Sequence, residues 1–270
     1  FSVMKSYTKE QFVKDVIAGI IVAIIALPLS IALALASGVT PEKGIYTAIT
    51  AGFVISFLGG SRVQIAGPTA AFATIVAGIV AKNGMDGLII ATLLAGVILI
   101  LMGFLRLGNL IKFIPYTITT GFTSGIAVTI FIGQIKDFLG LTIVSEEPLI
   151  ETMDKLKAVF QFISTTNVQA LLVGVISLLI LILWQYLPGF CKKIPPSLIA
   201  VLVGSAMVAL LNMNVNTIGD LYEISNKLPS ISLPAFSLKT VQNVLPDAFT
   251  IAILAAIESL LSCVVADSMV

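Results

Sequence analysis

An apolar run over residues 16–36 contains no charged side chain and is as long as a membrane-spanning helix needs to be. Further apolar stretches follow along the 270 residues, separated by polar, glycine-rich or proline-rich turns. Backbone N–H and C=O groups in lipid must find partners within the segment, so such stretches cross as helices. We therefore predict an all-α, multi-pass membrane protein. The predicted segments are 16–36, 44–58, 68–81, 85–105, 111–132, 168–186, 197–211 and 247–270.

The composition agrees with lipid as the solvent and excludes several classes of function. Hydrophobic residues make up 58% of the chain and charged residues 11%, whereas a soluble domain carries roughly 25% charged residues. The chain has no histidine and a net charge of +1, which disfavours an imidazole proton relay and nucleic-acid binding. Cys191 and Cys263 lie in a basic turn and an apolar segment, so no disulfide is predicted. Without a convincing nucleophile–base pair or metal cluster, neither an enzyme nor a cofactor is predicted.

The polar stretches suggest how the segments are connected and oriented. Residues 134–166 predict an amphipathic surface helix outside the membrane, and residues 212–246 predict a loop, with short strands as an option. Lys and Arg in the short loops favour a cytoplasmic N-terminus in the plasma (bacterial inner) membrane. The chain begins with Phe1 and ends at Val270 within an apolar pattern, so we expect it to be part of a longer protein.

The motif GPTAAF interrupts the third apolar segment. Gly67 and Pro68 predict a helix break there and a half-helix starting at Pro68, since proline at the first helical position loses no hydrogen bond. A helix that begins inside the membrane directs its free N–H groups and positive dipole end at a ligand, as in transporters. Thr69 would add a hydroxyl donor at the second helical position, and Ala70 and Ala71 would leave room. A proline kink packed against a neighbouring helix is an equally weighted alternative.

Glu258 lies in an apolar stretch with no other charge within eight residues on either side. An acid at the middle of a span costs roughly 2.5–3.5 kcal/mol on insertion scales, so it needs a partner or a function. Ser262 follows four residues later and shares its helix face. A carboxylate beside a hydroxyl is a candidate site for sodium or for a proton. A structural glutamate held by hydrogen bonds to helix ends is the alternative.

Two further patterns concern the shape of the helices. Pro28 removes the hydrogen bond to the carbonyl of Ile24 and predicts a kink in the first segment. That kink either shapes a cavity or only bends the helix. Gly121 and Gly125 form a small-xxx-small pair, which predicts close helix packing.

Three stretches together resemble the sulfate permease (SulP) family of anion transporters. DVIAGIIVAIIALPLSIALALASGVTPEKGIYTAI resembles the opening of the family, GGSRVQIAGPTAAFATIV its third segment and AIESLLSCVVADSM its eighth. The order and the spacing of the three stretches agree with the family as well. The match covers most of the chain.

The resemblance implies a seven-plus-seven inverted-repeat fold of fourteen segments, usually followed by a cytoplasmic STAS domain. Residues 1–270 would then be a truncated transporter domain, holding the first seven-segment repeat, with its broken third helix, and the eighth segment. Segments nine to fourteen and the STAS domain would be absent. In the family a core domain carries the substrate past a gate domain, and a homodimer is expected for the full-length protein.

The resemblance also implies roles for individual residues. The anion would lie at the half-helix end of the third segment, lined by Thr69, Ala70 and Ala71, with Leu29 and Leu33 of the first segment facing the same pocket. Glu258 falls on the acidic position that the family links to coupling with sodium or protons, and Ser262 matches the hydroxyl beside it. The tenth segment, which supplies the other half of the anion site, is missing from the sequence.

These patterns predict cation-coupled secondary active transport of a small inorganic anion, sulfate or bicarbonate, by an elevator-type movement. The expected partners are the anion, the lipid bilayer and H⁺ or Na⁺ as the coupling ion. A nucleobase permease of the related fold is one alternative, and an anion channel or exchanger is another. The absence of nucleobase-type motifs argues against the first of these.

Overall fold

The computed structural model describes residues 7–61, 64–108, 116–145, 149, 151–188, 194–222 and 234–269. Within these ranges the secondary structure is helical, which agrees with the predicted all-α class. The α-helices are α1 (Lys9–Ala36), α2 (Pro41–Leu58), α3 (Ala70–Phe104), α4 (Tyr116–Leu139), α5 (Thr152–Gln161), α6 (Val168–Leu183), α7 (Pro196–Leu210), α8 (Ile218–Leu221) and α9 (Leu238–Met269). Two short 3₁₀ helices, Ile163–Thr165 and Trp184–Tyr186, flank α6.

Four helical stretches among the described residues are long and apolar enough to cross a membrane: Lys9–Ala36, Ala70–Phe104, Val168–Tyr186 and Leu238–Cys263. The shorter helix α7 is also apolar. Helix α2 begins three residues before the predicted segment 44–58, and α4 extends seven residues beyond the end of the predicted segment 111–132. Residues 111–115 lie outside the described part of the chain. Many large apolar side chains on these helices are exposed, as expected of surfaces that face lipid or further protein segments.

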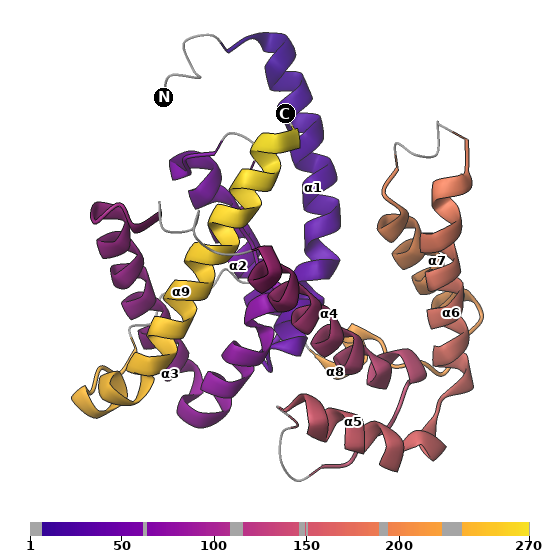
Figure 1. The fold of residues 1–270 in the computed structure, drawn as a ribbon. Coiled ribbons are helices and arrows are strands. Elements are labelled where there is room, and N and C mark those ends of the chain that lie inside the picture. Colours follow the sequence, from indigo (N-terminus) through magenta and orange to yellow (C-terminus); the bar gives the residue numbers. More distant parts are fainter. Residues whose placement is uncertain are drawn as a thin grey trace.

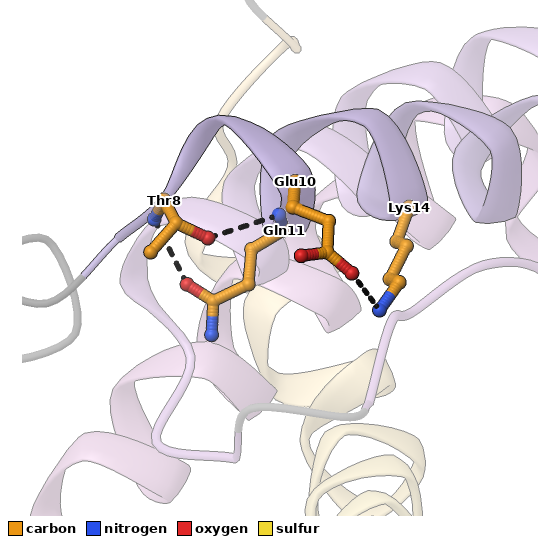
Figure 2. A network of polar contacts seen from close by, with 4 residues as sticks. All are labelled: Thr8, Glu10, Gln11 and Lys14. Carbon is orange, nitrogen blue, oxygen red and sulfur yellow. Dashed lines mark hydrogen bonds and ion pairs between the residues drawn. The ribbon is translucent and has the colours of Figure 1, made fainter.

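Helix α1 begins at Lys9, earlier than the predicted start at residue 16. A capping box explains the difference (Figure 2). The Gln11 N–H donates to the Thr8 hydroxyl at 3.2 Å, and the Thr8 N–H donates to the Gln11 side chain at 2.9 Å. The 28 residues of α1 extend about 42 Å, which exceeds the ~30 Å hydrocarbon core. The exposed Glu10–Lys14 ion pair, at 2.8 Å, contributes little stability.

Helix α3 changes direction at Gly84, where φ is 67° and ψ is −171°. The predicted segments 68–81 and 85–105 are therefore its two arms. Ile79 of the first arm, Ile90 and Ala91 of the second arm, and Val244 and Ala252 of α9 belong to one buried cluster. Helix α9 thus packs against both arms of α3, in the most extensive helix–helix contact of the chain.

Helix α9 also corrects the prediction of a loop over residues 212–246. It starts at Leu238 and contains Pro246 in its interior, and the one-turn helix α8 lies within the same predicted loop. Val244 is fully buried against α3, so tertiary packing holds the first turns of α9 in place despite the proline. Residues 223–233 lie outside the described part of the chain.

The helices form two groups. Helices α1, α2, α3 and α9 pack mainly with one another, and so do α4, α5, α6 and α7. The main contacts between the groups are those of α3 with α4 and of α1 with α7. Figure 1 shows α2, α3 and α9 on one side and α5, α6 and α7 on the other. The predicted surface helix is α5, whose Ala158 and Val159 are buried while Met153 and Phe160 are exposed.

Helix α2 packs closely on α1 at Gly44. A Cβ atom at Gly44 would overlap the backbone carbonyl of Ser30 and lie 2.9 Å from the Ala34 Cβ. We expect Gly44→Ala to destabilise the protein by about 1–3 kcal/mol through overpacking. The measurement is the thermal unfolding midpoint of the complete gene product in detergent.

Gly19→Ala is the matched control, because nothing lies within 4 Å of a Cβ built at Gly19 on α1 and alanine favours the helix. An unchanged midpoint for Gly44→Ala would contradict the close approach of α1 and α2.

Candidate functional site

The site begins with residues 64–69, which have no regular secondary structure and lead into α3. The helix starts at Ala70 rather than at Pro68, and Thr69 is its N-cap, with φ −128° and ψ 145°. The Thr69 hydroxyl accepts a hydrogen bond from the Ala71 N–H at 3.4 Å. Threonine is a preferred N-cap because its oxygen satisfies one of the free donors of the first turn. The prediction that Thr69 is the second helical residue is therefore wrong.

The Thr69 hydroxyl also joins α3 to α9. It donates a hydrogen bond of 2.6 Å to the Glu258 carboxylate, and the pair is partly buried. The two residues lie 189 positions apart in the sequence. The structure thus places the predicted coupling acid in direct contact with a residue of the predicted anion site.

A second polar contact links the same segment to α9. The Gln64 side-chain amide donates to the backbone carbonyl of Ser259 at 3.2 Å and to the Ser262 hydroxyl. Sequence reasoning assigned Ser262 but missed Gln64. A signal was present, because Gln64 stands in the apolar stretch VQIAG and an amide at membrane depth requires hydrogen-bond partners.

A cavity of about 320 Å³ lies beside the first turns of α3. It is lined by Ala70 and Ala71, by Gly121 and Gly125 of α4, and by Leu254 of α9, among others. Nothing lies within 4 Å of a Cβ built at either glycine. Within the part of the chain that the structure describes, the two glycines therefore border open space, and the predicted close packing against another helix is not made there.

The predicted residues of α1 occupy a different environment. Pro28 lies within α1, which remains one helix from Lys9 to Ala36. Leu33 is buried, whereas Leu29 is 51% exposed. The two leucines lie one turn apart on the same face of α1, and their role in lining the anion pocket stays a prediction. Gly67 lies just before the α3 cap, and a Cβ atom placed on it would have no neighbour within 4 Å.

The Glu258 carboxylate lies beside neutral oxygens. The described residues include no group of three or more His, Cys, Asp or Glu side chains that could hold a metal ion. Glu258 is accompanied instead by neutral oxygens, the hydroxyl of Thr69 in contact with it and that of Ser262 one turn further along α9. Oxygen ligands of this kind suit hard cations.

Comparisons with known proteins agree with these features. A sequence profile of the sulfate permease family matches residues 12–270. The "Putative sulfate transporter YvdB" of Bacillus subtilis (strain 168) is 42% identical over 98% of this chain. The bicarbonate transporter BicA of Picosynechococcus sp. is 31% identical over 94% of it. These relatives are named as transporters, in agreement with the prediction that the chain is not an enzyme.

A solved structure extends the comparison to the fold. The transmembrane domain of a cyanobacterium bicarbonate transporter BicA matches with a TM-score of 0.77 and 29% sequence identity, covering 93% of this chain and 64% of that chain. The chain covers 49% of YvdB and 46% of the Picosynechococcus BicA. It therefore spans about half the length of these relatives.

The contact between Thr69 and Glu258 can be tested through stability. Thr69→Val removes the α3 cap and the partner of Glu258, so we expect a loss of about 2 kcal/mol or more in unfolding free energy. Thr69→Ser keeps the hydroxyl and should stay near wild type. Thr92→Val is the matched control, since the exposed Thr92 hydroxyl donates to the Leu88 carbonyl of its own helix.

The measurement is thermal unfolding of each variant, combined with a double-mutant cycle between Thr69→Val and Glu258→Gln. Because both changes act on the same hydrogen bond between Thr69 and Glu258, the double variant should lose less unfolding free energy than the sum of the two single losses. Strict additivity would show that the two side chains do not interact.

Proposed function

The chain belongs to the sulfate permease family, and we propose that it forms the anion-binding and cation-coupling part of a secondary active transporter for sulfate or bicarbonate. The single observation that carries this proposal is the hydrogen bond between Thr69 at the α3 cap and Glu258 of α9. It connects a helix N-terminus that suits an anion with an acid that suits a cation. The names of the relatives support the substrate class.

The anion would bind at the start of α3. The first turn of a helix carries free N–H donors and the positive end of the helix dipole, which together favour a small oxyanion. Ala70 and Ala71 border the adjacent cavity of about 320 Å³, and their short side chains leave room beside the backbone. Cap sites of this kind serve substrate binding in other transporters with discontinuous helices.

The Thr69 hydroxyl supplies a physical reason for coupling. It has a single hydrogen, and that hydrogen is donated to Glu258. While this bond persists, Thr69 cannot donate to an anion, and the carboxylate charge repels one at short range. A proton or sodium ion at Glu258 would remove this repulsion and weaken the hydrogen bond that the carboxylate accepts from the Thr69 hydroxyl. Cation and anion would therefore bind cooperatively.

The two helix groups suit an elevator-type movement. Helices α1, α2, α3 and α9 hold the candidate site, and their main contacts with the α4–α7 group are confined to the pairs α3–α4 and α1–α7. A group that carries Thr69 and Glu258 together could slide along the other group without separating these two side chains. Gly121 and Gly125 of α4 line the cavity at this boundary, and neither has a side chain that would obstruct such a movement.

We place the transporter in the plasma (bacterial inner) membrane with the N-terminus cytoplasmic, on the distribution of Lys and Arg in short loops. The remaining segments of the fold would complete the anion site opposite α3, and the full-length protein would form a homodimer. Both expectations follow from family membership.

The proposed coupling predicts a specific loss. Proteoliposomes with the complete gene product should take up labelled bicarbonate or labelled sulfate in a saturable manner, driven by an imposed sodium or proton gradient. Glu258→Gln should abolish the stimulation by the gradient, because the neutral amide no longer binds the cation. Glu10→Gln, on the exposed first turn of α1, is the matched control and should behave as wild type.

Full gradient-dependent uptake by Glu258→Gln would refute the coupling role. Flux that does not saturate would favour an anion channel, and uptake that requires only a counter-anion would favour an exchanger.

The cavity predicts a second effect on transport. Gly125→Leu fills the space beside Ala70 and Ala71 without an initial clash, since nothing lies within 4 Å of a Cβ at Gly125. We expect uptake to fall at least tenfold while thermal stability is retained. Gly133→Leu on the same helix, also free of neighbours within 4 Å and outside the cavity lining, is the control. Equal uptake by the two variants would place the anion path elsewhere.

A further inference from the structure

Residues 64–69 are attached to α9 at two points, and only the Thr69 contact touches the proposed anion site. Thr69 contacts Glu258, and five residues earlier Gln64 contacts Ser259 and Ser262. As the chain advances from Gln64 to Thr69, its partners on α9 move back from Ser262 to Glu258. The segment therefore lies antiparallel to this part of α9, with one polar contact at each end.

The hydrogen-bonding capacity of Gln64 fixes how its side chain is oriented. Its amide nitrogen carries two hydrogens, and the structure gives it two acceptors, the Ser259 carbonyl and the Ser262 hydroxyl. The carbonyl can only accept, so the nitrogen rather than the oxygen of the Gln64 amide must face α9. Both donors of the amide are thereby engaged with residues on one turn of that helix.

This arrangement constrains Ser262 in turn. Because the Ser262 hydroxyl accepts from Gln64, one of its lone pairs is occupied and its own hydrogen must point elsewhere. Ser262 lies four residues after Glu258, on the same face of α9. The orientation of the hydroxyl beside the candidate cation position therefore depends on Gln64, a residue from a different part of the chain.

We propose that Gln64 is a positioning residue of the cation site, which fixes the Ser262 hydroxyl and the adjacent turn of α9 relative to Glu258. Gln64 acts on this site through its hydrogen bonds to Ser259 and Ser262. The inference rests on the proposed function, since it concerns the ion that drives transport. Partners that orient the ligands of a bound ion typically change its affinity 10–100-fold when they are removed.

The test separates cation affinity from anion affinity in proteoliposomes with the complete gene product. Gln64→Met keeps the length of the side chain and removes both donors. We expect it to raise the half-saturating sodium concentration about tenfold, or the half-saturating proton activity where protons drive uptake. The KM for labelled bicarbonate or sulfate at saturating cation should stay within about twofold of wild type. A purely structural role would instead lower the maximal rate and leave the half-saturating cation concentration unchanged.

Two further variants keep the inference falsifiable. Gln161→Met, at the exposed end of α5, is the matched control and should leave both constants unchanged. Ser262→Ala should raise the half-saturating cation concentration. Adding Gln64→Met to it should have a clearly smaller effect than Gln64→Met has alone, because Gln64 would have lost the hydroxyl it positions and would keep only the Ser259 carbonyl as a partner.

The outcomes distinguish the inference from the function on which it rests. Gradient-driven uptake by the wild-type protein, together with an unchanged cation dependence in Gln64→Met, would overturn the role of Gln64 alone. Independent, multiplicative effects of Gln64→Met and Ser262→Ala would also overturn it. Cation-independent uptake or no uptake by the wild-type protein would overturn the proposed function and the inference together.

Discussion

The packing of α9 against both arms of α3 is the contact on which the rest of this structure depends. In lipid there is no strong hydrophobic drive to bring helices together, so close packing of small residues and polar contacts must hold them. The buried cluster fits this requirement, since Ala91, Ala95 and Ala252 let the backbones approach while Ile90 and Val244 fill the remaining space. Because α3 changes direction at Gly84, both of its arms pack against α9.

The polar contacts of α9 are specific because that packing has already placed the backbones. Thr69 and Gln64 each reach α9 from a short non-helical segment, where backbone conformation rather than helix geometry sets the direction of the side chain. An acid that would otherwise be costly within the membrane obtains a donor in this way. The same contact places the Glu258 carboxylate beside the N-terminus of α3. One hydrogen bond thus gives Glu258 a donor and joins the proposed cation site to the proposed anion site.

Sequence reasoning identified the local features of this site and missed the relations between distant residues. The isolation of Glu258 and the Gly67–Pro68 pair are visible in the sequence because each violates what lipid tolerates. The partner of Glu258 is not visible, since it lies 189 residues away. The α3 start was misplaced because the preference of Thr69 for the cap outweighed that of Pro68 for the first helical position. The first turns of α9 contain polar residues and precede Pro246, and they are held against α3 by the buried Val244 and the partly buried Val241.

We propose that an anion bound at the α3 cap and a cation bound at Glu258 are energetically coupled through the contact between Thr69 and Glu258. Isothermal titration of the complete gene product with bicarbonate and with sulfate, at low and high sodium and at two pH values, tests it most directly. If the two sites are coupled, one cation will raise anion affinity roughly tenfold. Saturating anion will then raise the affinity for that cation by the same factor, as linkage requires. Anion affinity that is independent of sodium and of pH would contradict the account.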